Sequence, residues 1–178
     1  MATDQADPEL ARRFADELTA VAGTPHPGED PSRVAVDLLG PAPALVAIDD
    51  DLDLETLAET LTTAGHDVLR PPDPSYRDRL AGAAVGITRC VAAIADTGTL
   101  LLAFDQAHPR STSLLPRTHL AIVGPGDLVP TLADALARLP NPAPSAVTCV
   151  TGPSRSADIE QILTLGVHGP AQVHVVLS

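Results

Sequence analysis

The C-terminal part of the chain concentrates residue types that could bind a small anion. Between positions 151 and 160, the groups with backbone freedom, charge or hydroxyls are Gly152, Ser154, Arg155, Ser156 and Asp158. We expect a strand to end at Thr151 and a helix to follow it, capped by Ser154 or Ser156, because serine is a favoured N-cap residue. Exposed N–H groups at a helix start, together with arginine, would hold an anion. A well-capped helix with a surface arginine accounts for the same residues without a ligand.

Residues 166–170 follow this predicted helix and add a titratable group. Gly166 is suited to the left-handed cap of a helix, and Pro170 stops any continuation. His168, next to Gly169, could therefore donate or accept a proton at a ligand. A histidine that hydrogen-bonds a carbonyl at the helix end fits the pattern equally well.

The other polar segment is Asp96-Thr97-Gly98-Thr99, which interrupts a long apolar run. We predict a tight hairpin in which both threonine hydroxyls and free backbone N–H groups face a ligand. Asp96 would be a nucleophile, a base, or only the acceptor of its own turn. Aspartic proteases also carry Asp-Thr-Gly, but they pair two aspartates on all-β lobes, whereas this chain has one copy among alternating strands and helices.

A polar loop over residues 105–116 holds two further candidates, Arg110 and Ser113. Loops of this kind carry function more often than packing. The guanidinium of Arg110 could bind a carboxylate or phosphate through two parallel hydrogen bonds. His108 and His119 lack a recognisable metal-ligand spacing, so no metal site is predicted.

The composition excludes several mechanisms. The chain of 178 residues has a net charge of -12, and its eleven basic residues are all arginine. Without lysine there is no Schiff base and no lysine-containing phosphate loop. The acidic charge and the few aromatic residues argue against nucleic-acid binding. Two cysteines, Cys90 and Cys149, cannot ligate an iron–sulfur cluster, and each lies in an apolar run that predicts a buried thiol. We find no signal peptide or apolar span of about 20 residues, so a cytoplasmic location is expected.

Strands and helices that alternate along the chain must position these candidates. Expected helices are 7–22, 52–64, 76–84, 127–139 and 156–164, and a Pro/Gly-rich connector covers 24–31. Expected strands are 44–49, 66–70, 91–95, 99–104, 118–123, 145–151 and 171–177. This order predicts a mostly parallel sheet with both faces covered. Ligands bind beyond the carboxyl ends of such strands, where we expect both polar segments to lie.

Several motifs in order resemble the LUD-domain family, and within it the lactate-utilisation C proteins. The segments that carry the resemblance are 86–88, 93–99, 110, 113–116, 119, 151–160 and 166–170. Asp96 stands where the family usually has Glu. The resemblance covers residues 44–178, and residues 1–43 would add an N-terminal helix and a linker to one compact domain.

The resemblance implies a three-layer α/β sandwich like the NagB/RpiA/CoA-transferase group. It also implies a role in oxidising L-lactate to pyruvate beside iron–sulfur partner subunits. Since this chain has no cluster ligands and no dinucleotide motif, it would be a non-redox subunit with no cofactor of its own. Arg110 and Arg155 would then clamp a small carboxylate or phosphate, and His168 would accept a proton. The alternatives are a free-standing enzyme on an acyl, phospho-sugar or folate-like substrate, with Asp96 as nucleophile or base, and a pure scaffold.

Overall fold

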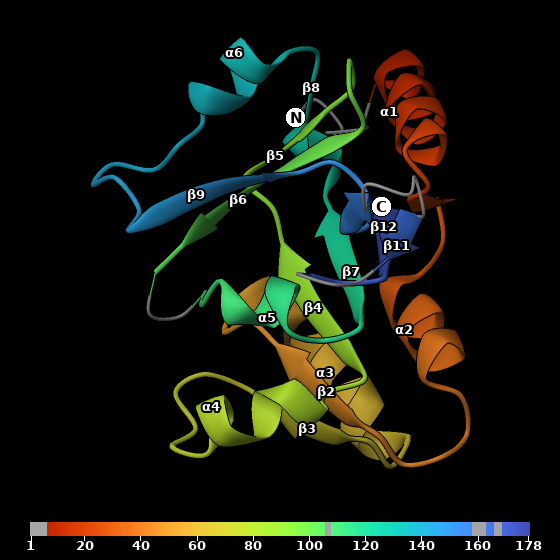
Figure 1. The fold of residues 1–178 in the computed structure, drawn as a ribbon, viewed down its shortest axis with the longest axis vertical. Coiled ribbons are helices and arrows are strands. Elements are labelled where there is room, and N and C mark those ends of the chain that lie inside the picture. Colours follow the sequence, from red (N-terminus) through yellow and green to blue (C-terminus); the bar gives the residue numbers. More distant parts are fainter. Residues whose placement is uncertain (1–6, 106–107, 158–162, 166–168) are drawn as a thin grey trace.

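A parallel sheet forms the centre of the molecule. The computed structural model describes residues 7–105, 108–157, 163–165 and 169–178. Within them, six strands pair in the order β1-β12-β7-β4-β2-β3, all parallel (Figure 1). They are β1 (Thr24–Pro27), β12 (Gln172–Leu177), β7 (Thr118–Val123), β4 (Val85–Arg89), β2 (Leu45–Ile48) and β3 (Asp67–Leu69). Strand β7 is buried at every position, as expected for a sheet covered on both faces.

Helices α2 (Pro31–Leu39) and α3 (Glu55–Thr63) cover one face of this sheet. Their buried side chains form one apolar cluster with alternate residues of β2, β4 and β7. Helix α2 begins at Asp30, whose carboxylate accepts a hydrogen bond from the Arg33 amide. This N-cap fixes where the helix starts.

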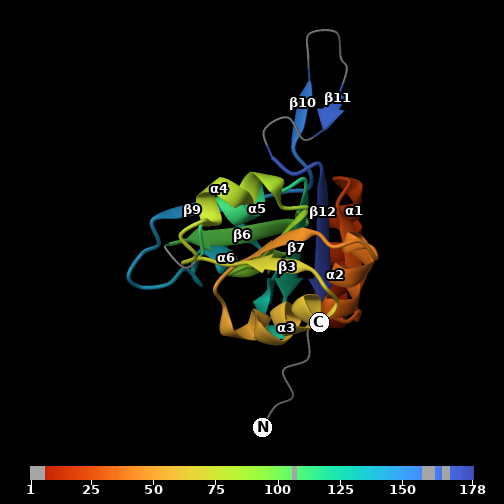
Figure 2. The same ribbon diagram turned by 90° about the horizontal axis from the view of Figure 1, so that it is seen from below.

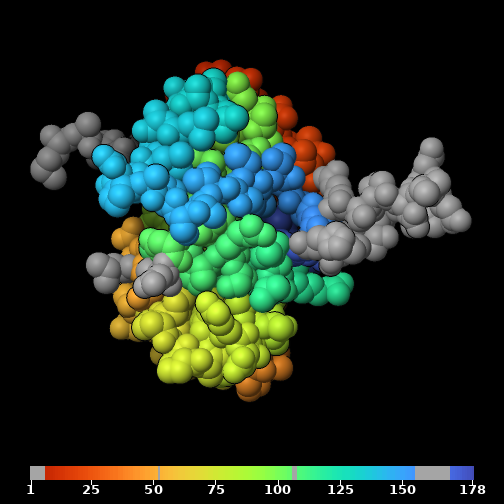
Figure 3. Space-filling view, turned by 60° about the vertical axis from the view of Figure 1, so that its left-hand side comes forward, coloured from red at the N-terminus to blue at the C-terminus, as the bar shows by residue number. Residues whose placement is uncertain are grey.

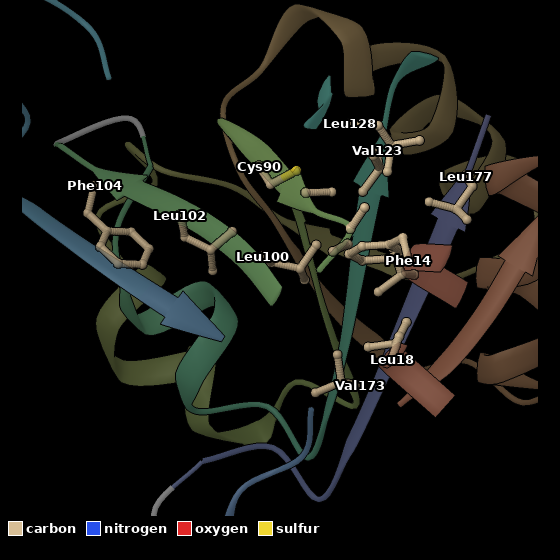
Figure 4. Close-up of a cluster of buried hydrophobic side chains, with 14 residues drawn as sticks. Phe14, Leu18, Cys90, Leu100, Leu102, Phe104, Val123, Leu128, Val173 and Leu177 are labelled. Atoms are coloured by element: carbon tan, nitrogen blue, oxygen red, sulfur yellow. The ribbon is translucent and has the colours of Figure 1, made fainter. Parts of the chain in front are cut away.

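Helix α1 (Pro8–Ala20) and a second sheet cover the other face. The second sheet has the order β8-β5-β6-β9, with β5 and β6, and β6 and β9, antiparallel. Its strands are β8 (Leu128–Val129), β5 (Ala92–Ile94), β6 (Thr99–Phe104) and β9 (Ala146–Val150). Figure 4 shows Phe14 and Leu18 of α1 among side chains from both sheets. The predicted α/β three-layer sandwich with a mostly parallel central sheet is therefore confirmed.

Shorter elements close the remaining surfaces. Helix α4 (Tyr76–Arg79) covers the edge at β2 and β3, α5 (Ser111–Leu114) contacts β4, and α6 (Leu132–Leu136) contacts β5. Short 3-10 turns lie at Leu52–Leu54, Leu80–Gly82 and Pro125–Asp127. None of the helices in the described part of the chain has the length and apolar character needed to cross a bilayer.

A two-stranded ribbon replaces the helix predicted over residues 156–164. Strand β10 (Arg155–Ala157) pairs antiparallel with β11 (Leu163–Leu165), and Figure 2 shows both strands projecting from the body of the molecule. The helix prediction is wrong in the described parts of this segment, and with it the idea that Ser154 or Ser156 caps a helix. The local sequence does not report pairing between strands, and here the pairing of β10 with β11 decides the structure.

Further elements differ from the prediction. The helix expected at 127–139 is shortened to α6, and β8 lies within its first residues. Strand β4 lies in the middle of the central sheet. The sequence does not predict it as a strand of its own, because a long apolar run continues directly after it. The connector expected at residues 24–31 contains β1, which pairs with β12. Helix α2 was also missed. Residues before position 44 thus contribute two helices and an edge strand to the layers described above.

Candidate functional site

Five of the predicted ligand-binding residues line one pocket. Its volume is about 320 Å³, and we name it the hydroxyl pocket. The predicted residues in its lining are Arg110, Ser113, Gly152, Ser154 and Gly169. The rest of the lining is Phe104, Leu114, Thr148, Cys149, Val150, Thr151 and Pro170. Strand β9 and helix α5 form two walls of the hydroxyl pocket, and Figure 3 shows the face of the molecule on which they lie side by side.

Helix α5 is held in place by close packing and hydrogen bonds. A Cβ atom on Gly86 of β4 would overlap the backbone carbonyl of Thr112, so glycine is required for this approach. The Thr112 hydroxyl also lies 2.6 Å from the phenolic oxygen of Tyr76 on α4. These contacts fix the helix that carries Ser113, whose hydroxyl donates to the carbonyl of Arg110 at 3.1 Å.

The charge of the hydroxyl pocket is opposite to that of the whole chain. Its lining includes the exposed Arg110 and, among described residues, no Asp or Glu. No carboxylate of the described residues forms an ion pair with the Arg110 guanidinium. Four residues with hydroxyl groups, Ser113, Thr148, Thr151 and Ser154, also line the pocket. An unpaired guanidinium beside several hydroxyls can bind a small carboxylate or phosphate.

The position of this pocket differs from the prediction. Ser154 is held by its amide, which donates to the carbonyl of Pro170 at 2.9 Å. Gly169 and Pro170 come just before β12, and α5 comes before β7, so the pocket lies toward the amino ends of these parallel strands. The polar segments follow β5 and β9, which belong to the second sheet. Our expectation that they lie at carboxyl ends of the parallel sheet is wrong.

The Asp96–Thr99 segment forms the predicted hairpin between β5 and β6, but it packs against α1. Asp96 forms an ion pair with Arg13 of α1, with 3.2 Å between the charged atoms. Gly98 has a φ of +59°, and a Cβ atom there would overlap the backbone of Leu18. Asp96, Thr97, Gly98 and Thr99 therefore lie outside the lining of the hydroxyl pocket.

One chain of hydroxyls connects the hairpin to the pocket. The Thr97 hydroxyl donates to the Thr99 oxygen at 2.8 Å, and Thr99 lies 2.8 Å from the hydroxyl of Thr151, which lines the pocket. Gly152, with a φ of +77°, approaches the carbonyl of Val21 just after α1. Helix α1 and the residues after it therefore support one wall of the pocket from behind.

The remaining predicted residues are Arg155, Asp158 and His168, which are not among the described residues that line the hydroxyl pocket. Asp158 and His168 lie outside the described residues, and the backbone of Arg155 begins β10. Sequence reasoning missed Thr148, Cys149 and Thr151, which β9 contributes to the lining. Cys149 is exposed, whereas we predicted a buried thiol; Cys90 is buried as predicted. Strand β9 is an edge strand whose burial alternates along it, but its sequence, Ala-Val-Thr-Cys-Val, has no matching alternation of apolar and polar residues, so no local signal marked these residues.

A metal centre has no support in the described part of the chain. No group of three or more His, Cys, Asp or Glu side chains there is placed to hold a metal ion.

Fold and site together define an α/β protein with a pocket between α5 and the second sheet, lined by Arg110 and by residues with hydroxyl groups. The family model of the LUD domain matches residues 11–178, so the chain belongs to the LUD domain family. A solved structure of a DUF162 family protein from Deinococcus radiodurans has the same fold, with a TM-score of 0.70 at 23% identity. That match covers 95% of this chain and 96% of the other.

Several curated relatives share one name. Lactate utilization protein C of Bacillus subtilis is 41% identical over 99 residues, which cover 52% of this chain and 41% of that protein. The proteins of the same name from Macrococcus caseolyticus and Oceanobacillus iheyensis are 39% and 40% identical over 99 residues. Those matches cover 43% and 42% of the two relatives. The matched part thus spans less than half the length of each.

Proposed function

We propose that this chain is a lactate-utilisation protein whose hydroxyl pocket binds a small carboxylate such as L-lactate or pyruvate. The observation that carries the proposal is Arg110, which lines the pocket and has no carboxylate partner among the described residues. The names of the curated relatives support the choice of substrate class. Guanidinium recognises a planar carboxylate through paired hydrogen bonds, and a nearby hydroxyl could bond the 2-hydroxyl or 2-keto oxygen.

In this proposal the chain acts in the cytoplasm as a non-redox component. Electrons from lactate would pass to iron–sulfur clusters on partner subunits, since this chain offers two cysteines, one buried and one exposed. The chain would bind or position the carboxylate and provide no cofactor itself. The alternative of a free-standing enzyme with Asp96 as nucleophile gains no support from the geometry, because Asp96 pairs with Arg13 outside the pocket.

Calorimetric titration with L-lactate, pyruvate and the neutral lactamide tests the ligand class. We expect Arg110→Gln to weaken binding of both carboxylates about tenfold or more, as loss of one charge-assisted contact would. Arg77→Gln is the matched control, since Arg77 is an exposed arginine on α4 outside the pocket lining. Lactamide bound as tightly as lactate, or an unchanged affinity in Arg110→Gln, would contradict the proposal.

Co-purification tests the partner class separately. The protein would be isolated by affinity from its own cells grown on L-lactate, and the eluate analysed for iron and by mass spectrometry. Iron-rich partner subunits are the expected result. A chain recovered alone and without iron would overturn the subunit role while leaving the carboxylate pocket to be judged by the titration.

A further inference from the structure

A second cavity of about 500 Å³ lies at the carboxyl ends of β2 and β4, and we name it the sheet-edge cavity. Asp49 follows the last residue of β2, and Arg89 and Cys90 stand at the end of β4. Phe104 lines this cavity as well as the hydroxyl pocket. The rest of its wall comes from β6, from the loop that follows it, and from residues 140–145 before β9. Crevices at such strand ends are common ligand sites in parallel sheets.

The cavity contains a buried carboxyl group with spare hydrogen-bonding capacity. Asp49 is 3% exposed, and its Oδ1 has no hydrogen-bond partner among the described residues. The Thr112 hydroxyl, close to this carboxyl group, is already bonded to Tyr76 and donates to the carbonyl of Pro109 at 3.0 Å. Burial raises the pKa of Asp49 to about 7. Burying a carboxyl group with an unused acceptor costs free energy, and a ligand that donates a hydrogen bond to the carboxyl group would recover part of that cost.

The charged groups around Asp49 make the cavity acidic. Asp51 and Asp105 also line it. The guanidinium of Arg89, which also lines the cavity, already pairs with Asp53 at 2.6 Å and with Asp127 at 2.8 Å. The imidazole of His108, another lining residue, lies 2.9 Å from a carboxylate oxygen of Asp105. Carboxylates in the lining therefore exceed the basic groups that remain to balance them, which favours a positively charged ligand.

The rest of the lining is mostly apolar. Leu102 and Phe104 from β6 and the prolines of residues 140–144 form the wall facing the carboxyl group. One polar exception is the hydroxyl of Thr88, which lies 2.9 Å from Nε2 of the fully buried His119. An acidic end and an apolar wall fit a molecule with the opposite arrangement, a cationic nitrogen on an apolar body.

We propose that the sheet-edge cavity is a second ligand site, which takes a small organic ammonium whose N–H group donates to Asp49 and whose apolar part lies against Leu102 and Phe104. This site is independent of the carboxylate proposed for the hydroxyl pocket. The two sites share the ring of Phe104 but differ in charge. Variants of Arg110 should therefore leave binding of the ammonium unchanged.

Three probes of one shape test this site without any substitution. They are benzylammonium, benzyl alcohol and benzoate, titrated into the full chain at neutral pH and followed by calorimetry or by protein NMR shifts. We expect benzylammonium to bind about tenfold more tightly than the alcohol, because a charge-assisted hydrogen bond is the stronger one, and benzoate to bind weakest. Equal affinities, the reverse order or no binding of benzylammonium at millimolar concentration would overturn the proposal.

The variant Asp49→Asn then locates the site. The amide has nearly the shape of the carboxyl group but carries no charge, so benzylammonium affinity should fall about tenfold, to that of benzyl alcohol. Asp37→Asn is the matched control, because it makes the same change of net charge at an exposed position on α2. If both variants lose affinity equally, or neither does, the ammonium is bound elsewhere and the proposal fails.

Discussion

The hydroxyl pocket and the sheet-edge cavity share Phe104 in their linings and are built in opposite ways. One has an exposed arginine among hydroxyl groups toward the amino ends of parallel strands. The other has a buried carboxyl group at the carboxyl ends of β2 and β4. The first is assembled from segments dense in glycine, serine and arginine. The second is assembled from single polar residues at the ends of apolar strands. Dense polar segments therefore mark only one of these two cavities.

The largest expected effect is a change of stability with pH that depends on the protonation of Asp49, the buried carboxyl group of the sheet-edge cavity. Its folded pKa of about 7 lies above the ordinary value of 3.8, so the folded state binds more protons than the unfolded state between these values. The free energy of unfolding should therefore fall as pH rises through this window. Asp49→Asn removes this loss and should be more stable than the wild type by up to about 4 kcal/mol near pH 8.

Urea denaturation at a series of pH values from about 4 to about 8 measures this difference. The matched control is Asp37→Asn, which should follow the wild-type pH dependence. A wild-type stability that does not fall across the window would mean that Asp49 titrates as an ordinary carboxyl group.

A somewhat smaller effect of opposite sign is expected at His119, behind the same cavity. Burial lowers its folded pKa from 6.5 to about 4, so the unfolded state binds more protons in this range. Stability contributed by neutral His119 is complete above about pH 6.5 and is lost as pH falls toward 4. His119→Gln should remove up to about 3 kcal/mol of this pH-dependent change.

The comparison variant for His119 is Thr88→Val. It removes the hydroxyl partner but leaves the ring buried, so the pH dependence should persist. The same denaturation series serves both variants. If Thr88→Val abolishes the pH dependence and His119→Gln does not, burial of the ring is the wrong cause.

Gly86→Ala is expected to disturb the hydroxyl pocket and the sheet-edge cavity at once. The new methyl group would overlap the carbonyl of Thr112, and α5 would have to move. We expect a loss of about 2–3 kcal/mol in the free energy of unfolding, with weaker binding of both L-lactate and benzylammonium. In Gly82→Ala, by contrast, the nearest atom is 4.0 Å away, so this control should change stability little. A Gly86→Ala chain with wild-type stability would show that α5 is not tightly positioned.

The smallest effect is expected for Thr99→Val, which acts on the hydroxyl pocket alone. It cuts the hydroxyl chain from Thr97 to Thr151, and should cost about 1 kcal/mol by thermal or urea denaturation. Thr63→Val, at an exposed position on α3, should be nearly neutral. A change in benzylammonium affinity in Thr99→Val would argue that the two cavities are coupled.

Much of the fold could be predicted because its strands are continuous apolar runs. Strands β2, β6, β7 and β12 lie where such runs predict them, and a parallel sheet follows from their alternation with helices. Strand β1, Thr-Pro-His-Pro, could not be predicted, since two prolines in four residues argue against a strand. These prolines are nevertheless compatible with an edge strand, because one side of such a strand forms no hydrogen bonds with a neighbouring strand. The ribbon of β10 and β11 was missed because local periodicity does not report pairing between strands.

The candidate site was predictable only in part. Arg110, Ser113, Gly152, Ser154 and Gly169 share a pocket because glycine, arginine and hydroxyl residues in loops are a recognisable local signal. Asp49 gives no such signal, since it is one of three consecutive acids after a strand. Its burial depends on Thr112 and the second sheet, which are remote in sequence. The same holds for the pairing of Asp96 with Arg13, which required knowing where α1 packs.

The order of strands in the central sheet has a consequence for synthesis on the ribosome. Strand β1 pairs with β12 and with no other strand of the described sheet, and His26 meets His174, 148 positions later. Chain growth at about 5–20 residues per second delays this pairing by many seconds after β1 emerges. During that delay β1 has an open edge while β2, β3, β4 and β7 can already associate. The emerging N-terminal segment is therefore the part of this protein with most to gain from a chaperone at the tunnel exit.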